Sequence, residues 1–218
     1  MSQKNIPTFK ANCRQCPRLA VFLDQVADKH PDYHAAPVAA FGDPDARLLI
    51  VGLAPGMHGA NATGRPFTGD YAGILLYQTL HDYGYGSHPV SVSRDDDLVL
   101  DGVRITNAVK CLPPQNKPQL DEVKNCNTFL RAEIGGLPDN AVVMALGKLA
   151  HDAVLRALGL KLSAFPFGHK QIHALSDSLT MVDSYHCSRY NTQTRRLTPG
   201  MFAEVFDTAG GLLERADS

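Results

Sequence analysis

Neither sign of charge dominates this sequence, and it lacks long apolar runs. The formal net charge of its 218 residues is −1, so attraction to a polyanion would have to come from a local basic patch. No apolar run approaches the roughly 20 residues that span a membrane. The N-terminal stretch "MSQKNIPTFKANC" also lacks the apolar segment of a secretory signal. We therefore expect a cytoplasmic protein with no membrane partner.

Two common nucleotide-binding motifs are missing as well. Neither Gly-x-x-x-x-Gly-Lys-[Ser/Thr] nor Gly-x-Gly-x-x-Gly occurs. The five cysteines are an odd number, and thiols stay reduced in the cytoplasm, so we do not expect a disulfide framework. Hydrophobic residues make up 44% and charged residues 20%, which is ordinary for a globular protein. We expect a single domain over residues 1–218, with an N-terminal segment that carries cysteines.

Short apolar segments alternate with longer segments that suit helices. We predict strands at Leu48–Gly52, Val103–Val109, Ala141–Leu146 and Leu179–Ser184. We predict helices at Arg18–Lys29, Ile74–Tyr83, Gln119–Ile134, Lys148–Leu158 and Pro199–Leu213. Apolar strands that alternate with helices are typical of a parallel sheet covered on both faces. The sequence thus predicts an α/β fold, a three-layer α/β/α sandwich around a central, mainly parallel four-stranded sheet.

Unusual polar and glycine-rich segments follow the predicted strands. The first strand runs into "VGLAPGMHGANATGRPFTGDYAG", the second ends in "TNAVKC", and the fourth is followed by "YHCSRYN". Ligands of such sheets bind beyond the carboxyl ends of the strands. A glycine-rich loop lets a ligand approach the backbone closely. We therefore expect a binding site at this edge of the sheet.

Four cysteines are candidate metal ligands. Cys13 and Cys16 form a Cys-x-x-Cys pair, and Cys111 and Cys126 are separated by fourteen residues. Four thiolates suit a [4Fe–4S] cluster or a structural zinc ion. The wide second pair favours a cluster, because zinc sites usually bring two tight pairs. The remaining alternative is that Cys111 and Cys126 are small buried hydrophobic residues.

In order and rough spacing, these segments resemble the uracil-DNA glycosylase superfamily, in particular its iron–sulfur branches. "GLAPG" at Gly52–Gly56 resembles the first motif of that superfamily, and "HCSRYN" at His186–Asn191 resembles the second. The family also matches two segments between these motifs, "GRPFTGDYAG" and "TNAVKC". The four cysteines match as well, two of them before the first motif and two between the motifs. Leu53 stands where a sister branch has Glu, so the sequence is identified as a member of family 5. The resemblance implies removal of uracil from DNA in base excision repair, leaving an abasic site. Hypoxanthine and other deaminated or damaged bases are further expected substrates.

The resemblance also implies roles for individual residues. Asp70 would position water or offset positive charge on the sugar, Asn107 would read the base edge, and His186 would donate a hydrogen bond to the base. Asp70 also suits the cap of the following helix, and the two roles are compatible. The expected substrate-binding residues are Gly52, Ala54, Gly56, Phe67, Ser188, Arg189 and Asn191. A structural [4Fe–4S] cluster on Cys13, Cys16, Cys111 and Cys126 is the implied cofactor.

The segment after the fourth strand is the expected DNA contact. Residues 188–191 would press into the minor groove, with the basic side chains of 195–196 and of 169–170 near phosphate. Cys187 and Arg189 replace prolines that are usual in the family, which puts the stiffness of this loop in question. We expect a monomer that acts without a lysine Schiff base or strand nicking, on nucleoid DNA of a prokaryotic cell. The alternatives are a non-catalytic, zinc-stabilised nucleic-acid-binding module and a hydrolase of free nucleosides.

Overall fold

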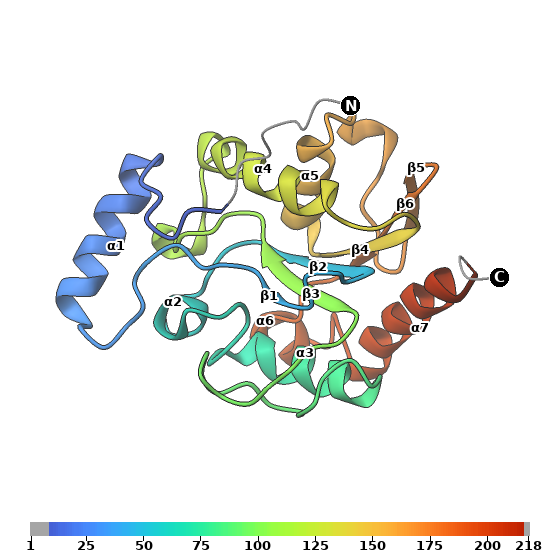
Figure 1. Cartoon of the computed structure of the whole chain (residues 1–218), viewed down its shortest axis with the longest axis horizontal. Coiled ribbons are helices and arrows are strands. Elements are labelled where there is room, and N and C mark those ends of the chain that lie inside the picture. The colour runs from blue at the N-terminus through green and yellow to red at the C-terminus, as the bar shows by residue number, and fades with distance from the viewer. Residues whose placement is uncertain (1–8, 216–218) are drawn as a thin grey trace.

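The computed structural model describes residues 9–215. It has a central sheet with helices on both faces, as predicted (Figure 1). The expected domain over residues 1–218 includes residues 1–8 and 216–218, which lie outside the described residues. Within the described range, no helix is both long enough and apolar enough to cross a bilayer.

The sheet has six strands in the order β1-β3-β2-β4-β6-β5. Their bounds are β1 Phe41–Gly42, β2 Leu48–Gly52, β3 Val103–Asn107, β4 Ala141–Leu146, β5 Ile172–Ser176 and β6 Leu179–Ser184. The four inner strands are parallel and are the four that the sequence predicts. The second of them ends at Asn107, two residues earlier than predicted.

The two antiparallel edge strands were not predicted. β1 has only two residues, too few for a hydrophobic pattern. β5 pairs antiparallel with β6, and most of its residues are at least partly exposed. Because an edge strand has one free side, it does not need the continuous apolar run that identifies an inner parallel strand.

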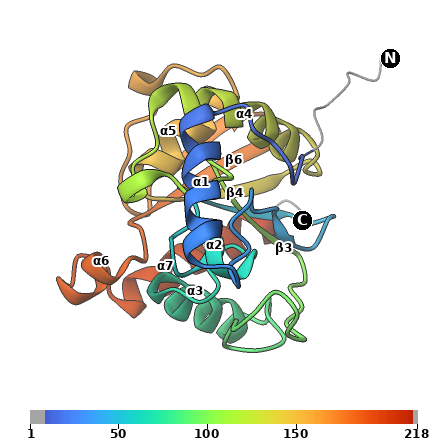
Figure 2. The same ribbon diagram turned by 90° about the vertical axis from the view of Figure 1, so that its left-hand side faces the viewer.

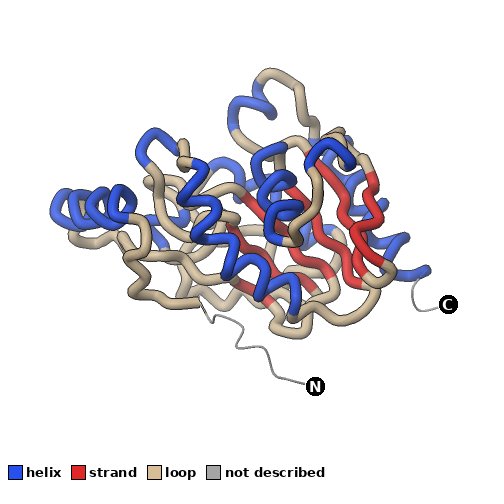
Figure 3. Tube along the Cα trace, turned by 90° about the horizontal axis from the view of Figure 1, so that it is seen from above, coloured by secondary structure: helices blue, strands red, loops and turns tan. Residues whose placement is uncertain are grey.

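The helices have bounds close to those predicted. They are α1 Pro17–Lys29, α2 Ala60–Thr63, α3 Tyr71–Asp82, α4 Leu120–Gly135, α5 Lys148–Ala157, α6 Arg189–Gln193 and α7 Pro199–Arg215, with short 3-10 turns at Pro114–Asn116 and Leu162–Ala164. The short helices α2 and α6 were not predicted. Seen from above, the strands lie side by side between the helices (Figure 3).

Alternate residues of the inner strands supply two cores. Leu48 and Ile50 pack on the face covered by α3 and α7, whereas Leu49 and Val51 pack on the face covered by α4 and α5. All four side chains have 0% exposure, and complete burial of such a side chain stabilises the fold by about 1.5–3 kcal/mol. Helix α1, which Figure 2 shows from the front, packs in a separate cluster that includes Cys16, Cys111 and Cys126.

Strand register brings the predicted motifs together. Gly52 at the end of β2 pairs with Asn107 at the end of β3. Leu146 at the end of β4 pairs with Ser184 at the end of β6, two residues before His186. The loops that leave these four strand ends therefore start at the same edge of the sheet.

Candidate active site

A cavity of about 330 Å³ opens at this edge. Eight of the predicted catalytic and substrate-binding residues line it: Ala54, Gly56, Phe67, Asp70, Asn107, His186, Ser188 and Arg189. The two others, Gly52 and Asn191, lie behind the lining and contact residues that form it. Segments that are far apart in the sequence thus build one site.

Gly52 lets two of these side chains approach the strand end. A Cβ at Gly52 would lie 2.4 Å from Asn107 Oδ1 and 2.6 Å from Phe67 Cζ, which is closer than real Cβ contacts. Phe67 itself has a φ of +54°, a conformation that costs a non-glycine residue about 1–3 kcal/mol and is concentrated at functional sites. The fold therefore holds the Phe67 ring against the end of β2 at an energetic cost.

The His186 ring faces Phe67. Their ring centroids are 6.0 Å apart with an angle of 29° between the planes. Gly147 has a φ of +92°, and a Cβ there would lie 3.3 Å from His186 Cβ. The Asn191 amide donates to the His186 carbonyl at 2.8 Å. Asn191 thus contacts the backbone of His186 and does not line the cavity.

The imidazole of His186 is neutral at physiological pH. Burial lowers its pKa to about 4, because desolvation penalises the charged form. Its Nδ1 is buried and has no hydrogen-bond partner among the described residues. An unpartnered polar atom beside a cavity is a place where a bound ligand completes the hydrogen bonding.

Asp70 caps α3 and also faces the glycine-rich loop. Its Oδ1 accepts a hydrogen bond from the Gly73 N–H at 2.9 Å, which confirms the predicted cap. A Cβ at Gly59 would lie 2.6 Å from Asp70 Oδ2, so Gly59 makes room for the carboxylate. Burial raises the pKa of Asp70, while backbone N–H groups of the helix oppose that shift.

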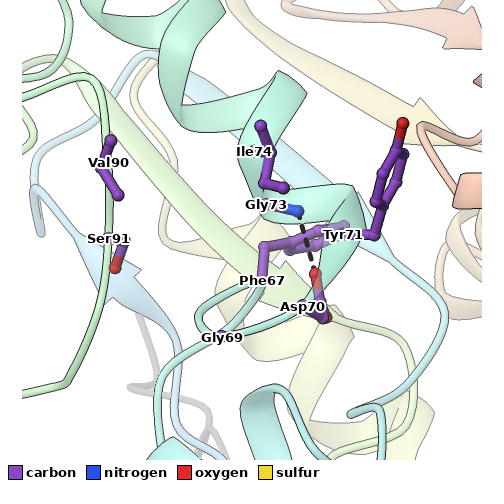
Figure 4. Close-up of a pocket in the computed structure, with 8 residues that line it drawn as sticks. All are labelled: Phe67, Gly69, Asp70, Tyr71, Gly73, Ile74, Val90 and Ser91. Atoms are coloured by element: carbon purple, nitrogen blue, oxygen red, sulfur yellow. Dashed lines mark hydrogen bonds between the residues drawn. The ribbon is translucent and has the colours of Figure 1, made fainter.

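A second hollow, of about 290 Å³, lies beside the first and shares Phe67, Asp70 and Tyr71 with it. Figure 4 shows the Asp70 carboxylate directed toward Gly73 at the start of α3, with Val90 and Ser91 on a neighbouring segment. Because Asp70 and Phe67 belong to both hollows, they form part of the wall between them.

Helix α6 forms an exposed rim at the candidate site and extends away from the sheet (Figure 2). Ser188 caps it, and the exposed Arg189 lies with its guanidinium carbon 5.8 Å from the centroid of the Tyr71 ring. Tyr190 is 71% exposed, more than any other large hydrophobic residue in the described part of the chain. Cys187, in contrast, is fully buried in the core.

Of the basic side chains predicted nearby, Arg195 and Arg196 are exposed. Arg196 lies over the Tyr185 ring, with its guanidinium carbon 4.8 Å from the ring centroid. Lys170 forms an ion pair with Glu204 at 2.8 Å, and His169 Nδ1 accepts from the Tyr185 N–H. The two arginines are therefore better placed than residues 169–170 to meet an external anion.

Asn116 is a lining residue that sequence reasoning missed. It lies in "PPQNKP", between the cysteines at 111 and 126, and both it and Gln115 have a φ of +56°. Two successive left-handed residues form a tight turn, which the Arg18 guanidinium supports by donating to the Lys117 carbonyl at 3.1 Å. The prolines around Asn116 were the available signal for such a turn.

The four candidate cysteine ligands gather between α1, the segment after β3, and α4. The pKa of Cys111 is raised to about 12, mainly by burial and then by the thiols of Cys126, Cys13 and Cys16, which are close enough to interact with it. The pKa of Cys126 is raised to about 11, again mainly by burial. Thiolates at this position therefore need a positively charged partner.

Three other metal-ligand side chains form a compact buried group. Among the described residues, the group whose ligand atoms all lie within 4.8 Å of one another consists of His151, His173 and Asp183. Asp183 accepts from His151 at 2.7 Å and from His173 at 2.9 Å. His151 Nε2 also meets the Phe165 carbonyl at 2.9 Å. These hydrogen bonds join α5, β5 and β6 and satisfy the buried carboxylate.

Comparison with known proteins identifies relatives across most of the chain. The model of the uracil DNA glycosylase superfamily matches residues 39–210. A type-5 uracil-DNA glycosylase of Thermus thermophilus is 48% identical over 198 residues, 88% of this chain and 90% of that protein. One of Pyrobaculum aerophilum is 43% identical over 202 residues, 91% of this chain and 88% of that protein. A type-4 enzyme of Thermotoga maritima is 39% identical, but only over 52% of this chain and 51% of that protein.

Because His186 is buried, we expect the free energy of unfolding to depend on pH in the acid range. Above pH 6.5 its ring is neutral in both the folded and unfolded states; as the pH falls toward 4, only the unfolded state binds the proton. Between pH 7 and pH 4, the free energy of unfolding of the wild-type protein should therefore fall by about 3 kcal/mol more than that of a His186→Asn variant. Denaturant titrations of both proteins at the two pH values measure this difference. Equal losses would contradict a depressed pKa.

Proposed function

Since the chain belongs to the uracil-DNA glycosylase superfamily, we propose that its cavity holds a uracil extruded from DNA while the N-glycosidic bond is hydrolysed, leaving an abasic site. The protein is a DNA glycosylase, a hydrolase acting on N-glycosyl bonds. The observation that carries the proposal for the site is the convergence of Phe67, Asp70, Asn107 and His186 on one cavity. An enzyme that acts on a base inside a duplex must hold the base outside the stack, in such a pocket.

Phe67 and Asn107 would hold the base. Stacking of a base on an aromatic ring contributes about 1–3 kcal/mol, and the Phe67 ring is fixed against Gly52. The Asn107 amide has both a donor and an acceptor, as a pyrimidine edge requires. Because both side chains touch the same strand end, the stacking surface and the edge-reading group keep a fixed relation to each other.

His186 would stabilise the departing base. Cleavage leaves negative charge on the base, and a donor held near a base oxygen is worth most where charge develops. The neutral ring has one N–H to donate, and its position is fixed by Gly147, Asn191 and Phe67. It would act as a hydrogen-bond donor rather than as a cation, because protonation requires a pH near 4.

Asp70 would serve the sugar side of the bond. Positive charge develops on the sugar as the base leaves, and a nearby carboxylate offsets it or orients the attacking water. One carboxylate oxygen is held by the Gly73 N–H, while the other faces Gly56 and Gly59. Helix α3 therefore fixes the acid and leaves one oxygen available.

We expect this chemistry to proceed without a covalent lysine intermediate. No lysine is among the residues that line the cavity, so far as the chain is described. Lys110 belongs to "TNAVKC", but it is 1% exposed and binds Glu133. We propose a monofunctional glycosylase, which leaves the strand intact.

The rim at α6 would contact DNA. Ser188 and Arg189 lie where the cavity meets the rim, and the exposed Tyr190 ring beside them suits insertion between bases. With a net charge of −1, affinity would rest on local arginines and fall with salt. We propose that the protein acts as a monomer of one domain in the cytoplasm, and that other deaminated bases such as hypoxanthine are further substrates.

The cysteine site fits a [4Fe–4S] cluster better than a zinc ion. A single zinc ion with zinc–sulfur bonds of about 2.3 Å draws its ligands close together. Among the described residues, these four thiols are not in a group compact enough to hold one metal ion, although they interact electrostatically. A larger cluster suits this spacing. Cys13, Cys16, Cys111 and Cys126 would hold it, and it would join the N-terminal segment to the domain.

The proposed reaction is tested with a DNA oligonucleotide that contains one deoxyuridine. We expect incubation with the protein to create an alkali-labile site at that position, with the strand unbroken before alkali. The same oligonucleotide with thymidine is the control. Release of uracil from free deoxyuridine but not from DNA would instead support a nucleoside hydrolase, and cleavage before alkali would contradict a monofunctional enzyme.

Asp70 variants separate its two roles. Asn is as good an N-cap as Asp, so Asp70→Asn should keep the melting temperature while it lowers single-turnover base release about 100-fold. Asp70→Ala should lower the rate similarly and also lose about 1 kcal/mol of stability. Full single-turnover activity of Asp70→Asn would rule out the catalytic role.

The cofactor is tested by metal and sulfide analysis of protein purified without oxygen. We expect about four irons and four sulfides per chain and a brown colour. Cys126→Ser should lose most of both, whereas Cys187→Ser, at the cysteine buried in the core, should retain them. One zinc per chain without sulfide would overturn the cluster.

A further inference from the structure

Lys110 is a buried cation directly beside the cysteine site. It follows β3 and precedes Cys111, and its exposure is 1%. Both carboxylate oxygens of Glu133 lie 2.8 Å from its Nζ, and Thr106 Oγ1 also accepts from it. Burial of a lysine is costly unless it is paired and hydrogen-bonded, and Lys110 has both kinds of partner.

The backbone of Lys110 connects this ion pair to the cysteines. Lys110 directly precedes Cys111 in the chain, and its carbonyl accepts from the Val38 N–H at 2.8 Å. The adjacent Asn125 side chain donates to the Cys16 sulfur at 3.5 Å. The Cys16 sulfur therefore receives an N–H donor from a residue that is not itself a ligand.

The positive charge of Lys110 and the negative charge of Glu133 have opposite effects on the stability of thiolates at the cysteine site. The thiolates of the four cysteines, three of which are buried, carry negative charge, which the Lys110 ammonium stabilises and the Glu133 carboxylate destabilises. The ammonium belongs to the residue next to Cys111, and both residues are buried. Glu133 lies on the same helix, seven residues or about two turns beyond Cys126.

We propose that Lys110 and Glu133 are part of the cofactor site, as a fixed ion pair that sets the electrostatic potential at the thiolates and thereby the reduction potential of the cluster. This rests on the cluster proposed above. Hydrogen bonds to the sulfurs and nearby charge are known determinants of cluster potentials. The two residues are positioning residues, since neither ligates the metal.

Removing each charge separately tests the pair. Lys110→Met keeps the length of the side chain but loses the charge, and it should shift the midpoint potential of the cluster downward. Glu133→Gln keeps an amide that accepts a hydrogen bond, and it should shift the potential upward. Lys124→Met is the matched control, because Lys124 is exposed on α4 two residues before Cys126 and solvent screens its charge. Protein-film voltammetry, in which the electrode supplies the electron, measures all three.

Shifts of opposite sign from these two substitutions, with little change in the control, are the expected result. Shifts of the same sign, or none, in proteins that retain their iron would overturn the proposal. If Lys110→Met does not fold, Glu133→Gln alone decides: a potential equal to or below that of wild type would overturn it. A wild-type protein without iron would overturn both the cluster and this inference, whereas the deoxyuridine assay tests base removal independently.

Discussion

Gly52 ends β2 with a hydrogen where any other residue would place a Cβ, and Phe67 and Asn107 occupy the space that this leaves. The rest of the candidate site depends on that contact. Phe67 reaches it with a left-handed backbone, and the chain that continues from Phe67 places Asp70 at the start of α3. The His186 ring then stacks against the Phe67 ring. A steric requirement at one strand end thus fixes the spacing of three other side chains.

Burial disfavours the charged forms of the titratable side chains around the contact of Gly52 with Phe67 and Asn107. His186 is held neutral by burial, and burial also raises the pKa of Asp70. Interactions with a developing charge are stronger where water is excluded, so the His186 N–H would act more strongly on a base that leaves as an anion than it would in water. The buried ion pair of Lys110 and Glu133 joins the segment after β3 to α4, and neither residue lines the cavity.

The sequence was sufficient for the features that depend on local chemistry. Four apolar runs identified the inner strands, and Asp70 was identified as a helix cap because its side chain suits that position. Features that depend on distant partners were not predictable. The protonation state of His186 follows from burial by several segments, and the role of Asn191 follows from a contact with the backbone of His186. Asn116 enters the cavity through a turn with two left-handed residues, for which its own residue type gives only a weak signal.

The cap formed by Asp70 has a consequence for how the gene tolerates damage. Both aspartate codons begin with guanine, and deamination of the cytosine opposite that guanine converts either codon to one for asparagine if the uracil is not removed. Because asparagine also caps helices well, the resulting protein would still fold and accumulate. Uracil is the lesion that this protein is proposed to repair. At the Asp70 codon of its own gene, an unrepaired uracil would therefore lead to a stable protein with impaired activity. The change would therefore show itself through lost activity rather than through loss of the folded protein.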